Sequence, residues 1–356
     1  TTTATTTAAT ATAATPGGPQ SRRRVVSSIV AGVLSSGILT RHIKHAFAEN
    51  ANANAAEPTT TANLLGTADR PVVIVGGSGR TGMAVAEAVA DPSFGNMFAV
   101  TLSRSGKDPF EIIKLPRATR DHLRHNAEPF DVRESREAIA ASLGALSPSV
   151  VVYAASASRR GGNASEVDDA GVEKVAMACR DAGAVFVLVS ALAVDRPDSK
   201  SFQVTNTLGG NYQGIMDAKR SGEDKTRSVF ASGNARSGYV IIRPGVLMNG
   251  KTTSGPLGLE LNQGDTIGGG LSRDELAGVV VGAIQNRALA KSSGRGGRGY
   301  TVEAYRRATA QKLEKKYVVP SGNELTVDAS VAASSSSSSP AGLYKELFAG
   351  AKPDTV

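Results

Sequence analysis

A glycine-rich segment between a short apolar run and an alanine-rich stretch constrains the fold of this chain most strongly. Val72–Val75 is apolar on both faces, which predicts a fully buried strand of a parallel sheet. Gly76, Gly79 and Gly82 follow in the pattern G-x-x-G-x-x-G, and Met83–Ala90 has the composition of a helix. A strand, a glycine turn and a helix in this order indicate a dinucleotide-binding loop, and the alternative is a glycine-rich surface turn.

Each glycine of this loop has an expected role. The first allows a tight turn, the second lets the backbone approach a pyrophosphate, and the third lets the helix pack closely on the strand. The free N–H groups at the start of the helix would bind the phosphates. The candidate cofactor-binding residues are therefore those of the whole loop: Gly76, Gly77, Ser78, Gly79, Arg80, Thr81 and Gly82.

Predicted strands and helices alternate along residues 68–317. This alternation predicts an α/β fold: a doubly wound parallel sheet of the Rossmann type in a single domain, preceded by a disordered N-terminal leader. Residues 105–128 are polar, and we predict an irregular insertion there, with 129–132 ending the third strand. After the first unit, further strands are expected at 96–103, 149–156, 184–190, 238–244 and 299–305, with helices at 133–143, 167–182, 216–232 and 272–284.

Residues 1–67 differ in composition from the rest of the chain. Residues 1–48 contain five basic residues and no acidic one, and removing these five from the net charge of +8 leaves +3. That remainder is ordinary for a soluble domain, so a nucleic-acid partner has little support. A Thr/Ser/Ala/Arg-rich, acid-free leader resembles an organelle transit peptide, and the arginines at 22–24 with the following apolar run resemble a twin-arginine signal.

We therefore expect a plastid (chloroplast) protein, in the stroma or associated with the thylakoid, with a thylakoid complex as a possible partner. The alternative is a disordered tail with accidental arginines. The apolar run at 25–39 is shorter than the ~20 residues that a membrane-spanning helix needs, so no stable transmembrane span is expected. We predict that 1–67 is a targeting leader and linker, largely disordered, and that 318–356 is a Ser-rich linker followed by a C-terminal helix at 341–348.

The single cysteine, Cys179, cannot form a disulfide within the chain. It lies in a predicted helix, where a buried thiol is expected to pack as a small apolar group. No cluster of cysteine and histidine residues has metal-ligand spacing, so no metal site is predicted.

The choice between NAD and NADP depends on the residue that follows the second strand of such a sheet. An acidic residue there binds the 2′-hydroxyl of NAD, whereas an arginine pairs with the 2′-phosphate of NADP. Here the strand is followed by Arg104 and Lys107, with no carboxylate before Asp108. Arg80 in the glycine loop could supply a second guanidinium, which favours NADP(H) as the cofactor. The alternative for Arg104 alone is a solvated loop charge.

Further motifs follow the glycine loop and Arg104 along the chain: Asp131-Val132, Tyr153–Ser156, Val167–Gly171, Val187–Ser190, Met216–Lys219 with Gly222-Glu223, and Ile241–Gly245. Together with the loop and Arg104, these motifs resemble the atypical short-chain dehydrogenase/reductases, especially the NAD(P)-binding, NmrA-like branch found in plastids. The resemblance covers roughly residues 70–310 and does not identify a substrate.

The resemblance implies a role for several of these residues. Asp131 and Val132 would flank the adenine, and Ala154 and Ala155 would line the ribose region. Lys219 would hold the nicotinamide ribose. The segment Pro244, Gly245 and Val246 would pack against the nicotinamide amide.

One departure from the family pattern concerns catalysis. Ordinary members have a tyrosine four residues before the lysine, which lowers the pKa of that phenol so that it can exchange a proton with a carbonyl. Here that position is Ile215, and Tyr212 lies seven residues before Lys219. Ser190 matches the family's usual serine, so Ser190 and Lys219 are the candidate catalytic residues; the alternatives are a serine that caps the following loop and a solvated helix lysine.

The sequence is consistent with two functions. The first is an NADP(H)-dependent oxidoreductase that acts on a small carbonyl, quinone or isoprenoid-like substrate. The second is a non-catalytic NADP(H)-binding redox sensor or assembly factor of a plastid complex.

Overall fold

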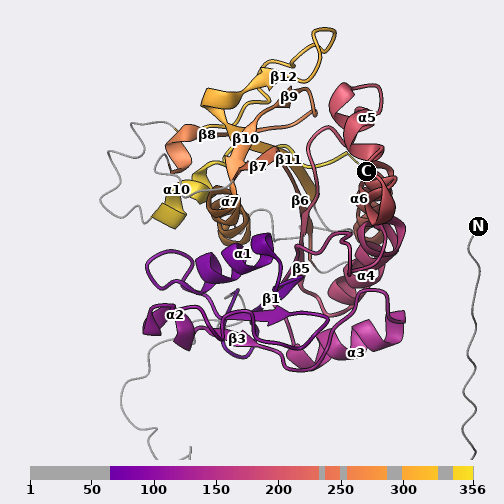
Figure 1. Cartoon of the computed structure of the whole chain (residues 1–356). Helices are drawn as coiled ribbons and strands as arrows, with labels where there is room; N and C mark the ends of the chain where they lie inside the picture. The colour runs from indigo at the N-terminus through magenta and orange to yellow at the C-terminus, as the bar shows by residue number, and fades with distance from the viewer. Residues whose placement is uncertain (1–64, 232–236, 249–254, 287–298, 328–339, 356) are drawn as a thin grey trace, which may run out of the picture. The chain divides into compact units, whose positions relative to one another are not determined.

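An eight-stranded sheet forms the centre of the described structure (Figure 1). The computed structural model describes residues 65–231, 237–248, 255–286, 299–327 and 340–355, so residues 1–64 of the predicted leader and linker and the serine run at 334–339 lie outside the described residues. The strand order is β3-β2-β1-β4-β5-β6-β11-β8. The strands are β1 (Val72–Val75), β2 (Ala99–Leu102), β3 (Leu123–His125), β4 (Val150–Tyr153), β5 (Val185–Val189), β6 (Tyr239–Pro244), β8 (Leu259–Asn262) and β11 (Gly299–Arg306).

All neighbouring strands of this sheet are parallel except β8, which pairs antiparallel with β11. Every residue of β1, β2 and β4 is buried, as expected for central strands that are apolar on both faces. The chain order reverses between β1 and β4, which is the arrangement of a doubly wound Rossmann sheet. The predicted fold class is therefore confirmed.

Helices cover both faces of the sheet. On one face, Val72 and Ile74 of β1 share a core cluster with residues of three helices, α1, α7 and α10. On the other face, Val73 and Val75 share a cluster with residues of α3, α4 and α6. The bounds are α1 (Arg80–Ala90), α3 (Arg136–Leu146), α4 (Val172–Asp181), α6 (Ile215–Ala231), α7 (Arg273–Gln285) and α10 (Pro340–Glu346).

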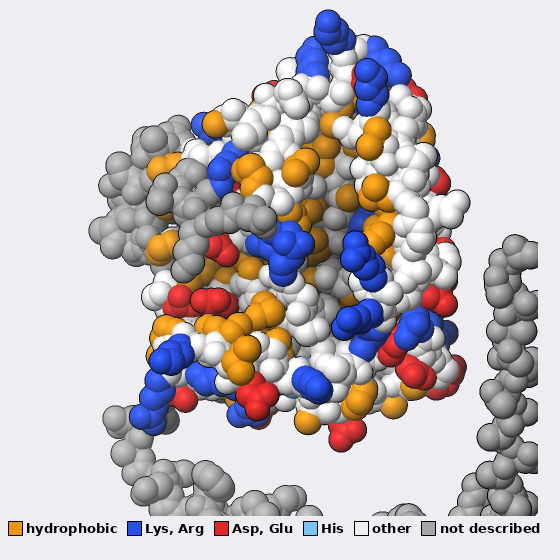
Figure 2. Space-filling view, in the orientation of Figure 1, with side chains coloured by type: hydrophobic (Ala, Val, Ile, Leu, Met, Phe, Trp, Pro, Cys, Tyr) orange, Lys and Arg blue, Asp and Glu red, His pale blue; other side chains and the backbone are white. Residues whose placement is uncertain are grey.

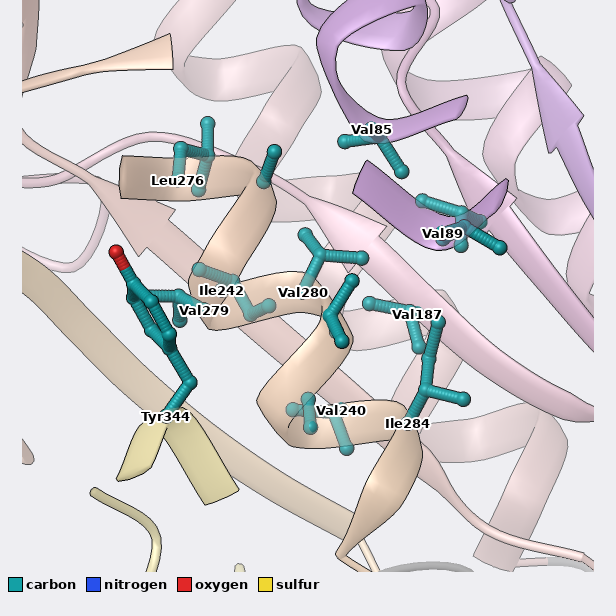
Figure 3. Packing of buried hydrophobic residues seen from close by; sticks show 14 of the residues in the cluster. Val85, Val89, Val187, Val240, Ile242, Leu276, Val279, Val280, Ile284 and Tyr344 are labelled. Carbon is teal, nitrogen blue, oxygen red and sulfur yellow. The ribbon is translucent and has the colours of Figure 1, made fainter. Parts of the chain in front are cut away.

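Figure 3 shows how α7 fills one face of the sheet. Leu276, Val280 and Ile284 of α7 lie between the strands and α1, together with valines of both. On its other side α7 meets Tyr344 of α10, and a Cβ on Gly278 would overlap the ring of that tyrosine. The predicted C-terminal helix therefore packs on the body of the fold.

The third strand does not lie where the sequence predicted it. The segment expected to be irregular contains α2 (Arg117–Asp121) and β3, whereas residues 129–132 form no strand. Among the described strands β3 pairs with β2 alone, and in it Leu123 is buried while Arg124 is exposed. An edge strand of three residues with one buried side chain has no continuous apolar run, and for that reason the prediction was wrong.

A smaller layer lies beyond the carboxyl ends of β5 and β6. It consists of two two-stranded sheets and one short helix (Figure 1). Strands β7 and β10 pair in parallel, and β9 and β12 pair antiparallel. The elements are β7 (Val246–Met248), β9 (Ile267–Gly268), β10 (Gly270–Ser272), β12 (Gln311–Lys312) and α5 (Lys200–Asn206).

Two further predictions concern the apolar character of single elements. Cys179 of α4 is fully buried, as expected of a thiol that packs as a small apolar group, and burial raises its pKa. Across the described residues, no helix has both the length and the hydropathy needed to cross a bilayer.

Candidate cofactor and substrate site

The glycine loop that joins β1 to α1 is closely packed at its glycines. Gly76 has a φ of +81°, and a Cβ there would lie 2.7 Å from the backbone nitrogen of Ala155. A Cβ on Gly82 would overlap the carbonyl oxygen of Gly76. The N–H of Gly77 donates to the carbonyl of Leu102 over 2.9 Å, which fixes the loop to β2. The loop therefore has the tight turn and the close helix-to-strand contact that were predicted for it.

The start of α1 carries no side-chain cap. Its N-cap residue is Gly79, and no side chain accepts a hydrogen bond there, whereas Ser272 caps α7 in a complete capping box. The first backbone N–H groups of a helix have no partner within the helix itself. At α1 these belong to Arg80, Thr81 and Gly82, and they can bind an anion such as a phosphate.

A cavity of about 180 Å³ opens at the carboxyl ends of β1 and β4, where the strand order reverses. This is the position at which doubly wound sheets bind ligands. We call it the first cavity. The predicted cofactor-binding residues that line it are Gly76, Ser78, Gly79, Arg104, Val132, Ala154 and Ala155. Gly77, Arg80, Thr81, Gly82 and Asp131 are not among its lining residues.

Arg104 is the one charged side chain among the described residues that line the first cavity. Its guanidinium donates a hydrogen bond to the carbonyl of Arg160, and it lies beside Gly161, whose Cβ would be 3.3 Å from one of its nitrogens. The hydroxyl oxygen of the neighbouring Ser103 is buried and has no hydrogen-bond partner in the described structure. The cavity therefore presents a cation and an unsatisfied hydroxyl to a ligand.

Two charged residues that were predicted to bind the cofactor, Asp131 and Arg80, interact with residues outside the first cavity. Asp131 accepts hydrogen bonds of 3.0 Å and 2.6 Å from Arg133, and this bonding lowers the pKa of Asp131, with a further contribution from the charge of Arg104. The charge of Arg80 acts on Arg273 at the start of α7, where burial and then Arg80 lower the pKa of the Arg273 guanidinium. Neither side chain lines the first cavity with Arg104.

Lys219 of α6 is held by a buried carboxylate. Its ammonium lies 2.7 Å from Oδ1 of Asp168, and the two side chains are only 13% and 1% exposed. Asp168 also accepts hydrogen bonds from the hydroxyl of Ser156 at 2.7 Å and from the N–H of Ala157 at 2.8 Å. Asp168 lies in a π-helix, η2 (Ser165–Gly171), and a Cβ on Gly222 of α6 would overlap its carbonyl oxygen. The lysine position is therefore fixed by a tightly packed helix pair.

Ser190 and Lys219 line one narrow cavity, together with Tyr153 and Asp168. The Ser190 hydroxyl oxygen is buried and has no hydrogen-bond partner among the described residues. Tyr153 donates its own hydroxyl to the carbonyl of Val167 over 2.5 Å, and burial raises its pKa, so this phenol is not a ready proton donor. The two predicted catalytic residues are thus brought together at a cavity of about 10 Å³, and the Ser190 hydroxyl has no partner within the described protein.

The position of the family's catalytic tyrosine is occupied by a buried aliphatic side chain. Ile215 is 8% exposed and belongs to an apolar cluster with Met216 and Phe202. Tyr212 lies in a short 3-10 helix, η3 (Gly210–Tyr212), and packs at the edge of that same cluster. Neither residue lines the narrow cavity of Ser190 and Lys219.

A second cavity, of about 720 Å³, lies between the end of β6, α5 and the small sheets. Pro244, Gly245 and Val246, predicted at the nicotinamide end of the cofactor, all line it. Its volume lies within the range of pockets that hold small organic ligands. The residues assigned to the adenine end and to the nicotinamide end therefore lie at two different cavities of one sheet edge.

These observations fit a nicotinamide dinucleotide. A Cβ has no room at Gly76, Gly77 or Gly82. The start of α1 is uncapped, and Ser103 and Ser190 have unsatisfied hydroxyls at either end. One residue of the candidate site, Asp168, was not predicted from the sequence. It lies inside the motif Val167–Gly171, but spacing alone does not tell which of its two aspartates binds Lys219, because Asp169 also contacts α6 through Lys225.

A separate buried charge cluster lies next to α6. Arg243 of β6 is 2% exposed and pairs with Glu223 at 2.5 Å, Asp195 at 2.5 Å, Glu303 at 3.4 Å and Asp265 at 3.9 Å. One guanidinium cannot neutralise all four surrounding carboxylates, so it does not fully offset the cost of burying their negative charges. Burial raises the pKa of Glu303 to about 8 and also raises that of Asp265.

Comparison with known proteins gives one family match. Residues 76–287, more than half of the chain, match the family model described as NAD(P)H-binding. No curated protein matches the chain.

Many solved structures resemble the fold. One is the oxidoreductase ylbE from Lactococcus lactis, with 16% identity, a TM-score of 0.46, and coverage of 67% of this chain and 92% of that one. Another is a putative NAD-dependent epimerase/dehydratase from Bacillus halodurans, with 18% identity, a TM-score of 0.46, and coverage of 66% and 93%. A third is the Bordetella bronchiseptica enzyme WbmH in complex with NAD+, with 15% identity, a TM-score of 0.43, and coverage of 68% and 77%.

Proposed function

Because the chain belongs to the NAD(P)H-binding family, a Rossmann group of the atypical short-chain dehydrogenase/reductase type, we propose that it is an NADP(H)-dependent oxidoreductase. Its substrate in this proposal is a carbonyl, quinone or isoprenoid-like compound. The choice of NADP(H) rests on the position of Arg104. This residue lines the first cavity, and none of the other described lining residues is an aspartate or a glutamate. A guanidinium there favours a 2′-phosphate over a 2′-hydroxyl.

The residues of the chain divide the work of holding the cofactor. The glycine loop and the uncapped start of α1 would bind the pyrophosphate, and Arg104 would bind the 2′-phosphate. Lys219, fixed by Asp168, would bind the nicotinamide ribose, and Pro244–Val246 would pack against the amide. A bound nicotinamide offers hydride transfer, so the protein or the substrate must supply the proton that accompanies it.

The donor of the proton that accompanies the hydride differs from the tyrosine of ordinary family members. Ile215 has no proton to exchange, and Tyr153 is committed to the carbonyl of Val167. Ser190, with its unsatisfied hydroxyl, can donate a hydrogen bond to a carbonyl oxygen. Lys219, solvent or the substrate itself would then supply the proton.

The proposal is tested by cofactor titration. Purified protein is expected to bind NADPH more tightly than NADH, because only NADPH carries the phosphate that Arg104 binds. In Arg104→Gln, the affinity for NADPH falls by about tenfold or more, the size of one lost charge-assisted hydrogen bond, and NADH affinity changes little. The matched control is Lys107→Gln, an exchange nearby that does not line the first cavity. Failure to bind either cofactor would refute the proposed function.

The buried Ile215 favours a second candidate function, a non-catalytic NADP(H)-binding redox sensor or assembly factor. Such a protein would keep the cofactor site and lose the proton donor. NADPH binding without turnover over a panel of carbonyls and quinones would support this candidate. Robust turnover of any panel member would exclude it.

The place of action is a separate proposal. The composition of residues 1–48 supports import into a plastid, with the protein in the stroma or at the thylakoid surface and a thylakoid complex as its partner in this proposal. A fluorescent fusion of the full-length chain tests this. Cytosolic fluorescence would refute it.

A further inference from the structure

The size and lining of the second cavity indicate a chemical class of substrate, which the family match does not identify. Its volume of about 720 Å³ is larger than a small aldehyde or ketone needs. Many of its lining side chains are apolar, among them Leu192, Val204, Met216, Met248 and Leu313. Figure 2 shows hydrophobic side chains along the hollow on this face of the molecule.

Two of the apolar side chains in this cavity are unusually exposed. Val246 is 75% exposed and Val204 is 68% exposed, although both line a concave surface. A large apolar side chain gains stability when a ligand removes it from water. The cavity therefore fits a ligand with an apolar body that covers these two valines.

The charges of the cavity are all of one sign. Lys200 and Lys312 line it, and none of its described lining residues is an aspartate or a glutamate. Neither lysine ammonium forms an ion pair with another described residue; Glu314 lies nearby, but it accepts from the backbone N–H of Lys200 rather than from its ammonium. Two cations without a carboxylate in the same lining attract an anion.

The apolar wall, the two lysines and the predicted nicotinamide contacts Pro244 and Gly245 belong to this one cavity. We propose that the substrate is an amphipathic anion, an apolar carbonyl or quinone compound that carries a fixed negative charge bound by Lys200 and Lys312. This inference rests on the proposed function and specifies its substrate class. A carboxylate, a sulfonate and a phosphate share the required chemistry.

A matched pair of ligands tests the charge. Neutral methylnaphthoquinone and anionic naphthoquinone sulfonate have the same ring system, and each is titrated by calorimetry into protein saturated with NADP+, so that no turnover occurs. We expect the sulfonate to bind about tenfold more tightly at low salt, and the difference to shrink as salt screens the lysines. The difference should disappear in the double variant Lys200→Gln/Lys312→Gln.

Lys315→Gln is the control, because Lys315 is exposed in the same segment and does not line the cavity. It should keep the preference for the sulfonate. Equal affinities for the two ligands, or an unchanged preference in the double variant, would overturn the inference. NADPH binding is measured on the same preparations: if NADPH binds and the sulfonate is not preferred, only the inference falls, whereas absence of NADPH binding overturns the proposed function and the inference with it.

Discussion

At the scale of single residues, the carboxylate of Asp168 determines where Lys219 can be. It binds the ammonium, the Ser156 hydroxyl and the Ala157 N–H at once, and it is almost fully buried. In Asp168→Asn the ammonium loses its counter-charge inside the protein. Breaking a buried ion pair by removing one partner is expensive, so we expect the free energy of unfolding to fall by roughly 3 kcal/mol.

The same variant should also bind NADPH more weakly, because Lys219 would no longer be held toward the ribose. Urea unfolding and fluorescence titration measure the two effects. Asp169→Asn is the matched control, since Asp169 is the next residue of η2 and its side chain is 23% exposed and paired with Lys225 at 2.9 Å. The control should cost less than about 1 kcal/mol. Equal losses in both variants would contradict the assigned role of Asp168.

Glu303 gives a prediction about pH. Burial raises the pKa of Glu303 to about 8 from an ordinary value of 4.5, against the opposing charge of Arg243 and beside Asp265 and Glu223. Between these two values the folded protein holds a proton that the unfolded chain has released. Stability therefore falls as the pH rises from about 5 to about 8, by up to ~1.4 kcal/mol per pH unit.

Urea unfolding over this pH range measures the effect. Glu303→Gln cannot ionise, so its stability should lose this pH dependence and exceed that of the wild type most clearly near pH 8. The exposed Glu324→Gln should keep the wild-type slope. Parallel pH profiles for the wild type and Glu303→Gln would show that Glu303 is ionised throughout.

At the scale of elements, two helix glycines differ sharply in what surrounds them. A Cβ on Gly82 in α1 would overlap the carbonyl oxygen of Gly76, whereas a Cβ on Gly144 in α3 meets nothing within 4 Å. Gly82→Ala should therefore displace α1 from the loop, destabilise the protein by about 1–3 kcal/mol and abolish tight NADPH binding. Gly144→Ala should stabilise it by up to about 1 kcal/mol.

Thermal or urea unfolding of the two variants checks this prediction. The pair is informative because the same substitution is made in two helices of the same length, 11 residues. If Gly82→Ala were neutral and bound NADPH normally, the close contact between loop and helix would not matter for the site.

Elements were predictable where one physical signal determined them. Val72–Val75 and Val150–Tyr153 are buried on both faces, so each apolar run identified a central strand. Strand β3 was missed because one buried side chain, Leu123, leaves no pattern. The helix expected at 167–182 is confirmed as helical, but its first turns are the π-helix η2, which sequence periodicity does not reveal.

The candidate site was predictable to the extent that it is local in sequence. The glycine loop and Arg104 follow from their distance to β1 and β2, and the structure brings Arg104 and three loop residues, Gly76, Ser78 and Gly79, to one cavity. The partner of Lys219, Asp168, lies 51 positions away, and the partners of Arg243 include Glu223 at 20 positions and Glu303 at 60. Such pairs depend on how the helices and strands are packed, and no local pattern encodes them.

At the scale of the folded body, the C-terminal segment joins regions that lie far apart in the chain. The carboxylate of Asp354 accepts hydrogen bonds from Tyr239 of β6 at 2.9 Å and from Thr301 of β11 at 2.8 Å. Tyr344 of α10 packs over Gly278 of α7 (Figure 3). The body therefore uses residues 340–355 as part of its core, although they come after all eight strands of the main sheet.

Tyr344→Ala tests whether this segment stabilises the whole body. Tyr344 is 6% exposed, and its removal leaves a cavity against the glycine face of α7, so the free energy of unfolding should fall by about 3 kcal/mol. Lys345→Ala, at the exposed neighbouring position, should change it by less than about 0.5 kcal/mol. NADPH affinity should be unchanged in both variants, because neither residue lines a cavity of the candidate site. A stability loss below about 1 kcal/mol in Tyr344→Ala would mean that α10 contributes little to the fold and that α7 is stable without it.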